Sequence, residues 1–238
     1  MSSFTLAWHF LIFGVLPYVV IAVLVLGSLA RFVLAPFSWK SQSSEILDKK
    51  DIFWGANLFH IGVIFLFCGH CFGLFTPTEW LNAAGLTPRL HQMMEIICGG
   101  LSAIVAITGL IILTWRRLTN ERVRAASRPS DFWVLFLLLA VIILGIGCVV
   151  NSYLYDKSGA TIILLGGWVR GLFSFDYQAW QNILLVPDWQ KAHIFVGLII
   201  FLIVPFTRLF HIWSGYLSVF YLIRPHQIMR ANNGKPMK

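Results

Sequence analysis

The chain has few charged residues for its length. Only 12% of its 238 residues are Asp, Glu, Lys or Arg, whereas a soluble domain carries about 25%. Hydrophobic residues make up 58% of the sequence, and a soluble fold cannot hide that much apolar surface inside itself. No polar stretch is long enough to form a separate domain. The sequence therefore leaves no segment that could fold as a soluble catalytic domain.

Cysteine is also scarce, and the one close pair fits neither redox motif that it resembles. Cys68 and Cys71 form a CxxC, but they lie in an apolar run without the strand–helix setting of a thioredoxin-like site. Covalent attachment of a c-type haem needs His directly after the second Cys, and here Phe72 follows. Apolar surroundings also suppress the thiolate that thiol chemistry requires. These absences exclude a c-type haem and argue against a redox-active disulfide.

Long hydrophobic runs are what the sequence does have. Crossing the hydrocarbon core of a bilayer takes about 20 mostly apolar residues. Five stretches meet that length, at about 10–34, 52–75, 93–115, 132–153 and 192–213. No Lys or Arg precedes the first run, which is the reverse of a secretory signal peptide, so we expect a retained helix. The sequence predicts an all-α membrane protein with five transmembrane helices in a single integral membrane domain, residues 1–238.

Basic residues predict the orientation of these helices. Fourteen of the eighteen fall in alternate connections and at the C-terminal end: Arg31, Lys40, Lys49, Lys50, Arg116, Arg117, Arg122, Arg124, Arg128, Arg208, Arg224, Arg230, Lys235 and Lys238. Only Arg89, Lys157, Arg170 and Lys191 remain for the other side. By the positive-inside rule the N-terminus is outside and the C-terminus is cytoplasmic, in the cytoplasmic (inner) membrane. The net charge of +8 then reflects topology and contact with lipids or a partner rather than nucleic-acid binding.

Four histidines lie inside the second and fifth hydrophobic runs. Histidine in hydrocarbon is rare and costly, so four of them need a common reason. His60 and His70 are ten residues apart, and His193 and His211 are eighteen apart. Four neutral imidazoles can axially ligate two haem irons, two for each iron. The histidines therefore predict a membrane electron carrier with two haem b groups.

The predicted topology also pairs the histidines. The second and fifth helices run in opposite directions, so His60 should face His211 near the cytoplasmic side, and His70 should face His193 near the outer side. Eighteen residues return to nearly the same face of a helix, so His193 and His211 should point the same way. Ten residues leave His60 and His70 about 80° apart, which is a poorer match. Arg208, three residues before His211, is a candidate for contacting the inner haem's propionates. A snorkelling arginine is the alternative reading.

Short strings throughout the chain resemble one known family. They are Pro17-Tyr18, Trp39, Ser43-Ser44, Leu47-Asp48, Asn57 through Gly62, Gly69-His70, Phe72-Gly73, Thr76-Pro77, Gly99-Gly100, Arg116-Arg117, Arg122-Val123-Arg124, Pro205-Phe206, Arg208 and His211-Ile212-Trp213. Their order and the histidine spacings resemble the gamma subunit of membrane-bound respiratory nitrate reductase, a di-haem cytochrome b. The resemblance runs from about Pro17 to Trp213.

This resemblance implies a role and partners for the chain. It implies that quinol is oxidised beside the outer haem, and that electrons leave to an iron–sulfur beta subunit and a molybdenum-containing alpha subunit on the cytoplasmic face. The quinol site would lie close to Gly69, His70 and a basic residue at the start of the third helix. Known members carry Lys there, whereas this chain offers His91, whose imidazole can accept a proton near neutral pH. Nitrate itself would be reduced on a partner subunit.

Docking of those partners is expected through Ser38–Asp51, Arg116–Arg128 and the C-terminal tail. Between the fourth and fifth runs, the aromatic stretch Gly166–Trp180 is expected to lie along the membrane interface.

Two other functions stay open. The chain could be the cytochrome b subunit of another molybdenum or sulfur-metabolising complex, or a membrane scaffold or transporter without haem. Reduced-minus-oxidised haem b absorbance distinguishes the last of these from the rest.

Overall fold

The computed structural model describes residues 3–35 and 52–213. Within those ranges every regular element is helical. Five helical segments are long and apolar enough to cross a membrane: Ser3–Leu34, Ile52–Phe75, Pro88–Thr119, Pro129–Tyr155 and Asp188–Phe206. The predicted all-α fold with five membrane-length helices is confirmed.

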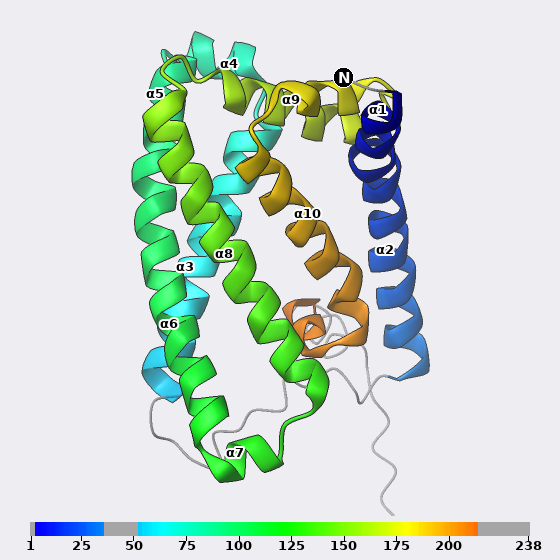
Figure 1. Cartoon of the computed structure of the whole chain (residues 1–238), viewed down its shortest axis with the longest axis vertical. Helices are drawn as coiled ribbons and strands as arrows, with labels where there is room; N and C mark the ends of the chain where they lie inside the picture. Colours follow the sequence, from blue (N-terminus) through cyan, green and yellow to red (C-terminus); the bar gives the residue numbers. More distant parts are fainter. Residues whose placement is uncertain (1–2, 36–51, 214–238) are drawn as a thin grey trace, which may run out of the picture.

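The first and third spans are each built from consecutive elements joined through a π-helical turn. In chain order the described elements are α1 (Ser3–Phe10), η1 (Leu11–Val15), α2 (Leu16–Leu34), α3 (Ile52–Phe75), α4 (Thr78–Ala83), α5 (Pro88–Met94), η3 (Glu95–Gly99), α6 (Gly100–Thr119), α7 (Glu121–Ala125), α8 (Pro129–Tyr155), α9 (Ala160–Phe173), η4 (Ala179–Leu185), α10 (Asp188–Ile203), η5 (Val204–Phe206) and η6 (Arg208–Phe210). Figure 1 shows the long helices standing side by side, with α9 at one end of the bundle and α7 at the other. We call these the α9 end and the α7 end.

Glycines allow α3 and α6 to pack closely. A Cβ on Gly62 would lie 2.5 Å from the backbone nitrogen of Ala106, and one on Gly109 would overlap the backbone of Phe59. Small residues at a helix interface let two backbones approach in a membrane, where lipid supplies no hydrophobic driving force between helices. The α3 helix therefore packs mainly on α6, while α10 packs on α8 and α2.

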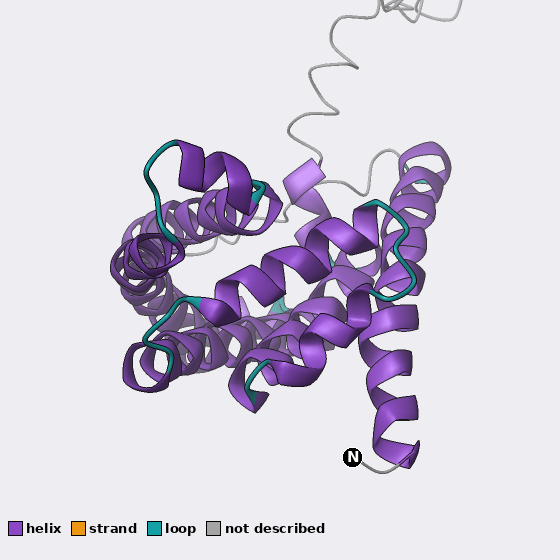
Figure 2. Cartoon of the chain, turned by 90° about the horizontal axis from the view of Figure 1, so that it is seen from above, coloured by secondary structure: helices purple, strands orange, loops and turns teal. Residues whose placement is uncertain are grey.

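The long connection between the fourth and fifth spans contains a helix, α9, which crosses the α9 end of the bundle (Figures 1 and 2). Trp168 Nε1 donates to the carbonyl of Phe13 at 2.8 Å, and the Tyr18 hydroxyl donates to the carbonyl of Leu172 at 3.1 Å. Trp168 and Phe13 belong to a buried apolar cluster shared by α9, η4 and the first span. These contacts fix α9 against the N-terminal helix.

The fifth span differs from its predicted range of 192–213. The helix α10 ends at Ile203, and Thr207 adopts an extended conformation with φ −120° and ψ −178°. Pro205 explains the break, because it has no N–H to donate and its ring clashes with the preceding helical turn. Arg31 Nη1 donates to the freed carbonyls of Pro205 and Thr207 at 2.8 and 2.7 Å. The expectation that His193 and His211 share one face of a continuous helix is therefore wrong.

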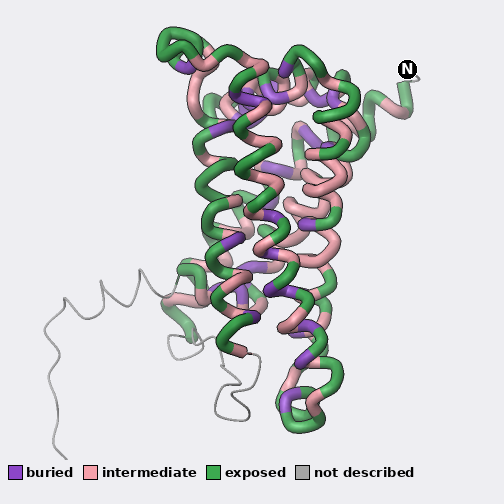
Figure 3. Tube along the Cα trace, turned by 90° about the vertical axis from the view of Figure 1, so that its left-hand side faces the viewer, coloured by how far each residue is buried: buried purple, intermediate pink, exposed green. Residues whose placement is uncertain are grey.

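Exposed residues recur along the whole length of the long helices (Figure 3). Many of them are large and apolar, including Phe65, Ile104 and Ile143, each more than half exposed. An apolar outer surface on helices of this length is the surface that lipid covers.

Basic residues gather at one end of the bundle, as the predicted topology requires. The α7 end carries Arg31, Arg116, Arg117, Arg122, Arg124, Arg128 and Arg208, and the α9 end carries Arg89, Lys157, Arg170 and Lys191. Two of the three predicted docking segments, Ser38–Asp51 and the C-terminal tail from residue 214, lie outside the described residues. The third, Arg116–Arg128, contains the end of α6 and the short helix α7.

Candidate functional site

Two pairs of histidines face one another across the bundle. The rings of His60 on α3 and His211 after η6 have centroids 6.0 Å apart, with their planes at 70°. The rings of His70 on α3 and His193 on α10 are also 6.0 Å apart, with planes at 19°. The first pair lies toward the α7 end and the second toward the α9 end, because α3 and α10 run in opposite directions. The structure thus brings together both predicted pairs.

Each of these four imidazoles is anchored through the same nitrogen. The Nδ1 atoms of His60 and His70 lie 2.7 Å from the carbonyls of Ala56 and Leu66, one helical turn earlier. Those of His193 and His211 lie 2.9 Å from the carbonyl of Val141 and 2.7 Å from that of Arg208. A hydrogen bond from Nδ1–H to a carbonyl fixes the tautomer and makes Nε2 the nitrogen that can bind a metal, which is the usual arrangement of a metal-binding histidine.

The spacing of each pair suits one metal ion between two imidazoles. Two ring nitrogens each about 2 Å from a shared metal place the ring centroids roughly 6 Å apart. Within residues 3–35 and 52–213, no group of three or more His, Cys, Asp or Glu could hold an ion alone. A metal between these pairs would therefore need further ligands from a macrocycle such as haem. The donor set of two axial imidazoles fits haem b.

Two features leave space around the facing rings. The helices α3 and α10, which carry three of the four histidines, pack chiefly on other helices rather than on each other. On α8, Gly145 lies against the ring of His193, where an added Cβ would come within 3.1 Å of Cε1. A larger residue at this position would push the imidazole out of its orientation.

Arg208 is engaged by an acidic residue that the sequence analysis overlooked. Its Nε and Nη2 donate to the carboxylate of Asp131 at 2.7 and 2.6 Å, and Arg117 Nη1 donates to the same carboxylate at 3.1 Å. The Arg128 backbone N–H adds a fourth bond at 3.0 Å. An acidic residue at the start of an apolar run, directly after a cluster of arginines, was the available signal. The pairing ties η6, and with it His211, to α6 and α8.

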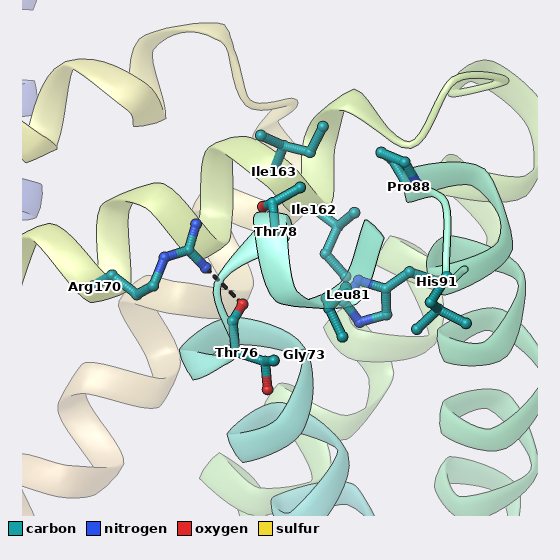
Figure 4. A pocket seen from close by; sticks show the side chains of 10 residues that line it. Gly73, Thr76, Thr78, Leu81, Pro88, His91, Ile162, Ile163 and Arg170 are labelled. Atoms are coloured by element: carbon teal, nitrogen blue, oxygen red, sulfur yellow. Dashed lines mark hydrogen bonds between the residues drawn. The ribbon is translucent and has the colours of Figure 1, made fainter. Parts of the chain in front are cut away.

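His91 lies at the α9 end beside a shallow pocket (Figure 4). Its side chain is buried, with 4% exposed, and its Nε2 has no hydrogen-bond partner. Gly73, Thr76, Leu81 and Arg170 also line the pocket. Arg170 Nη1 donates to the carbonyls of Leu74 and Thr76, both at 3.1 Å, and so caps the end of α3. The buried His91 ring thus has one nitrogen, Nε2, that can accept or donate a hydrogen bond to a ligand.

Two glycines on α3 lie near His70 and His91 and have different surroundings. An added Cβ at Gly69 would meet nothing within 4 Å. At Gly73, one turn further along, it would lie 3.3 Å from His91 Nε2 and 2.6 Å from Oε1 of Glu95. Glu95 was not among the predicted site residues. Its position inside the third hydrophobic run was a signal, since ionisable residues there are rare.

A tight turn after α8 holds the α9 end together. The Asp156 carboxylate accepts bonds from the backbone N–H groups of Ser158, Gly159 and Thr161 at 2.9–3.0 Å. Burial raises the pKa of Asp156, but hydrogen bonds from Thr161 and Ser158 outweigh it and leave that pKa well below its ordinary value. Gln92, next to His91, donates to the Asp156 carbonyl at 2.9 Å. The turn therefore fixes the position of α5.

The fold and the site define a class of protein. It is a multi-pass helical membrane protein with two facing pairs of histidines. Comparison with known proteins is more specific. The sequence profile of the family described as nitrate reductase gamma subunit matches residues 9–232. The chain belongs to this family.

Curated relatives agree with this assignment. The respiratory nitrate reductase 2 gamma chain of Escherichia coli (strain K12) is 35% identical over 219 residues, covering 92% of this chain and 95% of that one. The nitrate reductase gamma chain of Bacillus subtilis (strain 168) is 34% identical over 224 residues, covering 94% and 98%. The nitrate reductase-like protein NarX of Mycobacterium tuberculosis (strain ATCC 25618 / H37Rv) is 28% identical over 93% of this chain, but the match covers 34% of that longer protein.

Proposed function

We propose that the chain is the membrane anchor and quinol-oxidising di-haem cytochrome b subunit of a respiratory nitrate reductase. It takes electrons from quinol on the outer side of the cytoplasmic membrane and delivers them to an iron–sulfur subunit on the cytoplasmic side. The observation that carries this proposal is the pair of cross-helix histidine contacts, each at 6.0 Å and each with both Nδ1 atoms on carbonyls. Membership of the nitrate reductase gamma subunit family supports the complex.

In this proposal His60 and His211 hold the inner haem b, and His70 and His193 hold the outer one. Two haems held in this way would supply one-electron carriers at two depths in the membrane. The histidines hold their Nε2 atoms in place through the carbonyl bonds. Arg208 is a candidate partner for the inner propionates: its Nε and Nη2 donate to Asp131, and the other N–H groups of the guanidinium would serve that contact.

The α9 end provides the quinol side. Gly69 leaves the approach to His70 free of side-chain bulk, and His91 has an unused nitrogen beside the pocket. Quinol oxidation releases protons, so an acceptor has to stand within hydrogen-bond reach of a quinol hydroxyl or one water away. His91 has the chemistry for that role.

The α7 end provides the partner side. Its basic residues support it as the cytoplasmic end by the positive-inside rule, with the N-terminus outside. An iron–sulfur beta subunit docks on this end and passes electrons to the molybdenum-containing alpha subunit, where nitrate is reduced. Anionic lipid headgroups share the same basic surface.

The test uses membranes that contain the intact complex. Quinol added anaerobically should reduce b-type haem, and later addition of nitrate should reoxidise it. Haem that quinol reduces but nitrate leaves reduced would assign the chain to another respiratory complex. The absence of b-type absorbance from the purified chain would favour a scaffold or transporter.

A further inference from the structure

Glu95 is a carboxylate inside the third membrane span. It begins the π-helical segment η3, and the apolar run around it contains no other acidic residue. Among the described residues none forms an ion pair with it. Holding a carboxylate in an apolar span is costly, and such residues mark proton or ligand pathways. π-Helical turns inside α-helices are also frequent at functional sites.

Glu95 and His91 converge on the same point of α3. Both side chains lie against Gly73: a Cβ added there would be 2.6 Å from Glu95 Oε1 and 3.3 Å from His91 Nε2. His91 Nε2 is fully buried without a partner, whereas Glu95 keeps part of its side chain accessible. Glu95 also follows His91 by four residues and so lies one turn deeper in the span. His91 thus borders the pocket, and Glu95 lies one helical turn from it.

The nearby cations are engaged elsewhere. Arg89 donates to the side chain of Gln92 at 2.7 Å and to the Asp156 carbonyl at 3.2 Å. Arg170 donates to carbonyls at the end of α3. The Glu95 carboxylate is therefore free to exchange a proton with a ligand and with His91.

We propose that Glu95 is a further catalytic residue for quinol oxidation, as the membrane-facing member of a Glu95–His91 proton pair. This rests on the proposed function. A quinol hydroxyl donates a hydrogen bond to the Glu95 carboxylate; its O–H bond breaks, the proton passes to Glu95, and the electron leaves to the one-electron acceptor that the outer haem would supply. Glu95 then gives the proton to His91 Nε2, and His91 releases it into the pocket at the α9 end. The same route carries the second proton, so two protons and two electrons leave each quinol.

The experiment compares three variants in membranes with the intact complex. Glu95→Gln keeps the shape and removes the proton-accepting carboxylate. Gly73→Ala keeps the carboxylate but displaces its oxygen, because the new Cβ takes up the space beside it. Glu79→Gln is the matched control, since Glu79 is an exposed glutamate on α4 at the same end. The rate of haem reduction by a short-chain quinol is measured by rapid mixing, and dithionite-reduced spectra give the haem content.

The expected result is about a hundredfold slower reduction by quinol in Glu95→Gln, slower reduction in Gly73→Ala, and a normal rate in Glu79→Gln, with haem spectra unchanged in all three. Infrared difference spectra taken on adding the quinol should show a carboxyl band in the wild type and in Glu79→Gln that is missing in Glu95→Gln. A normal rate, or an unchanged carboxyl band, in Glu95→Gln would overturn the proposal. If quinol fails to reduce haem in the wild type while dithionite succeeds, it is the proposed function that fails.

Discussion

Replacing Asp131 with Ala should destabilise the α7 end and release the inner haem first. The Asp131 side chain is 5% exposed and pairs with Arg117 and Arg208, which are 12% and 23% exposed. Removing the acid leaves two arginines facing each other without a counter-charge. Breaking a buried pair in this way costs about 3–5 kcal/mol, and the partial exposure of Arg208 places the value near the lower end. For a protein of this size that corresponds to a Tm lower by about 10 °C.

The assay is thermal unfolding in detergent, followed by tryptophan fluorescence and by the haem absorbance. Because His211 Nδ1 is bonded to the Arg208 carbonyl at 2.7 Å, loss of the Arg208–Asp131 pair should weaken inner-haem binding at temperatures where the outer haem is retained. The control is Asp188→Ala, since the Asp188 side chain is 98% exposed and its pair with Lys191 contributes little. An Asp131→Ala protein that melts within about 2 °C of wild type would show that Asp131 does not hold the α7 end together.

Three further predictions concern separate parts of the chain. His70→Ala should remove the outer haem and leave the inner one, which low-temperature absorbance spectra check. Gly62→Ala should cost about 1–3 kcal/mol, because its Cβ would meet the backbone of Ala106; Gly99→Ala, where an added Cβ meets nothing within 4 Å, is its control in the same melt. Asp156→Asn should lower stability at neutral pH. The folded-state pKa of Asp156 is depressed, so its contribution is present above its unfolded pKa of about 3.9 and is lost as the pH falls below it; the gap between variant and wild type should narrow in acid.

Hydropathy predicted the helical spans well because each span has to satisfy its backbone within itself. The second run, predicted at 52–75, coincides with α3 (Ile52–Phe75). The fifth run differs because the helix ends before Pro205, which has no backbone N–H to donate. A prediction from length and hydropathy does not take that missing donor into account. Helix α9 was missed because a short helix at the end of a bundle gives no span-length signal.

The histidine pairs follow from topology, since antiparallel helices leave one way to match their depths. The carboxylates of Asp131 and Glu95 do not follow from it. Their roles depend on which groups lie next to them in the fold. Asp131 lies between two arginines of other elements, and Glu95 lies against Gly73. A sequence shows that an acid lies in an apolar run but not what neutralises it.

The decisive measurement for the di-haem proposal is the ratio of haem b to polypeptide in the purified chain. Two haems are expected in the wild type, one in His193→Ala and one in His211→Ala, with a different haem lost in each. One haem in the wild type, or the same haem lost from both variants, would contradict it.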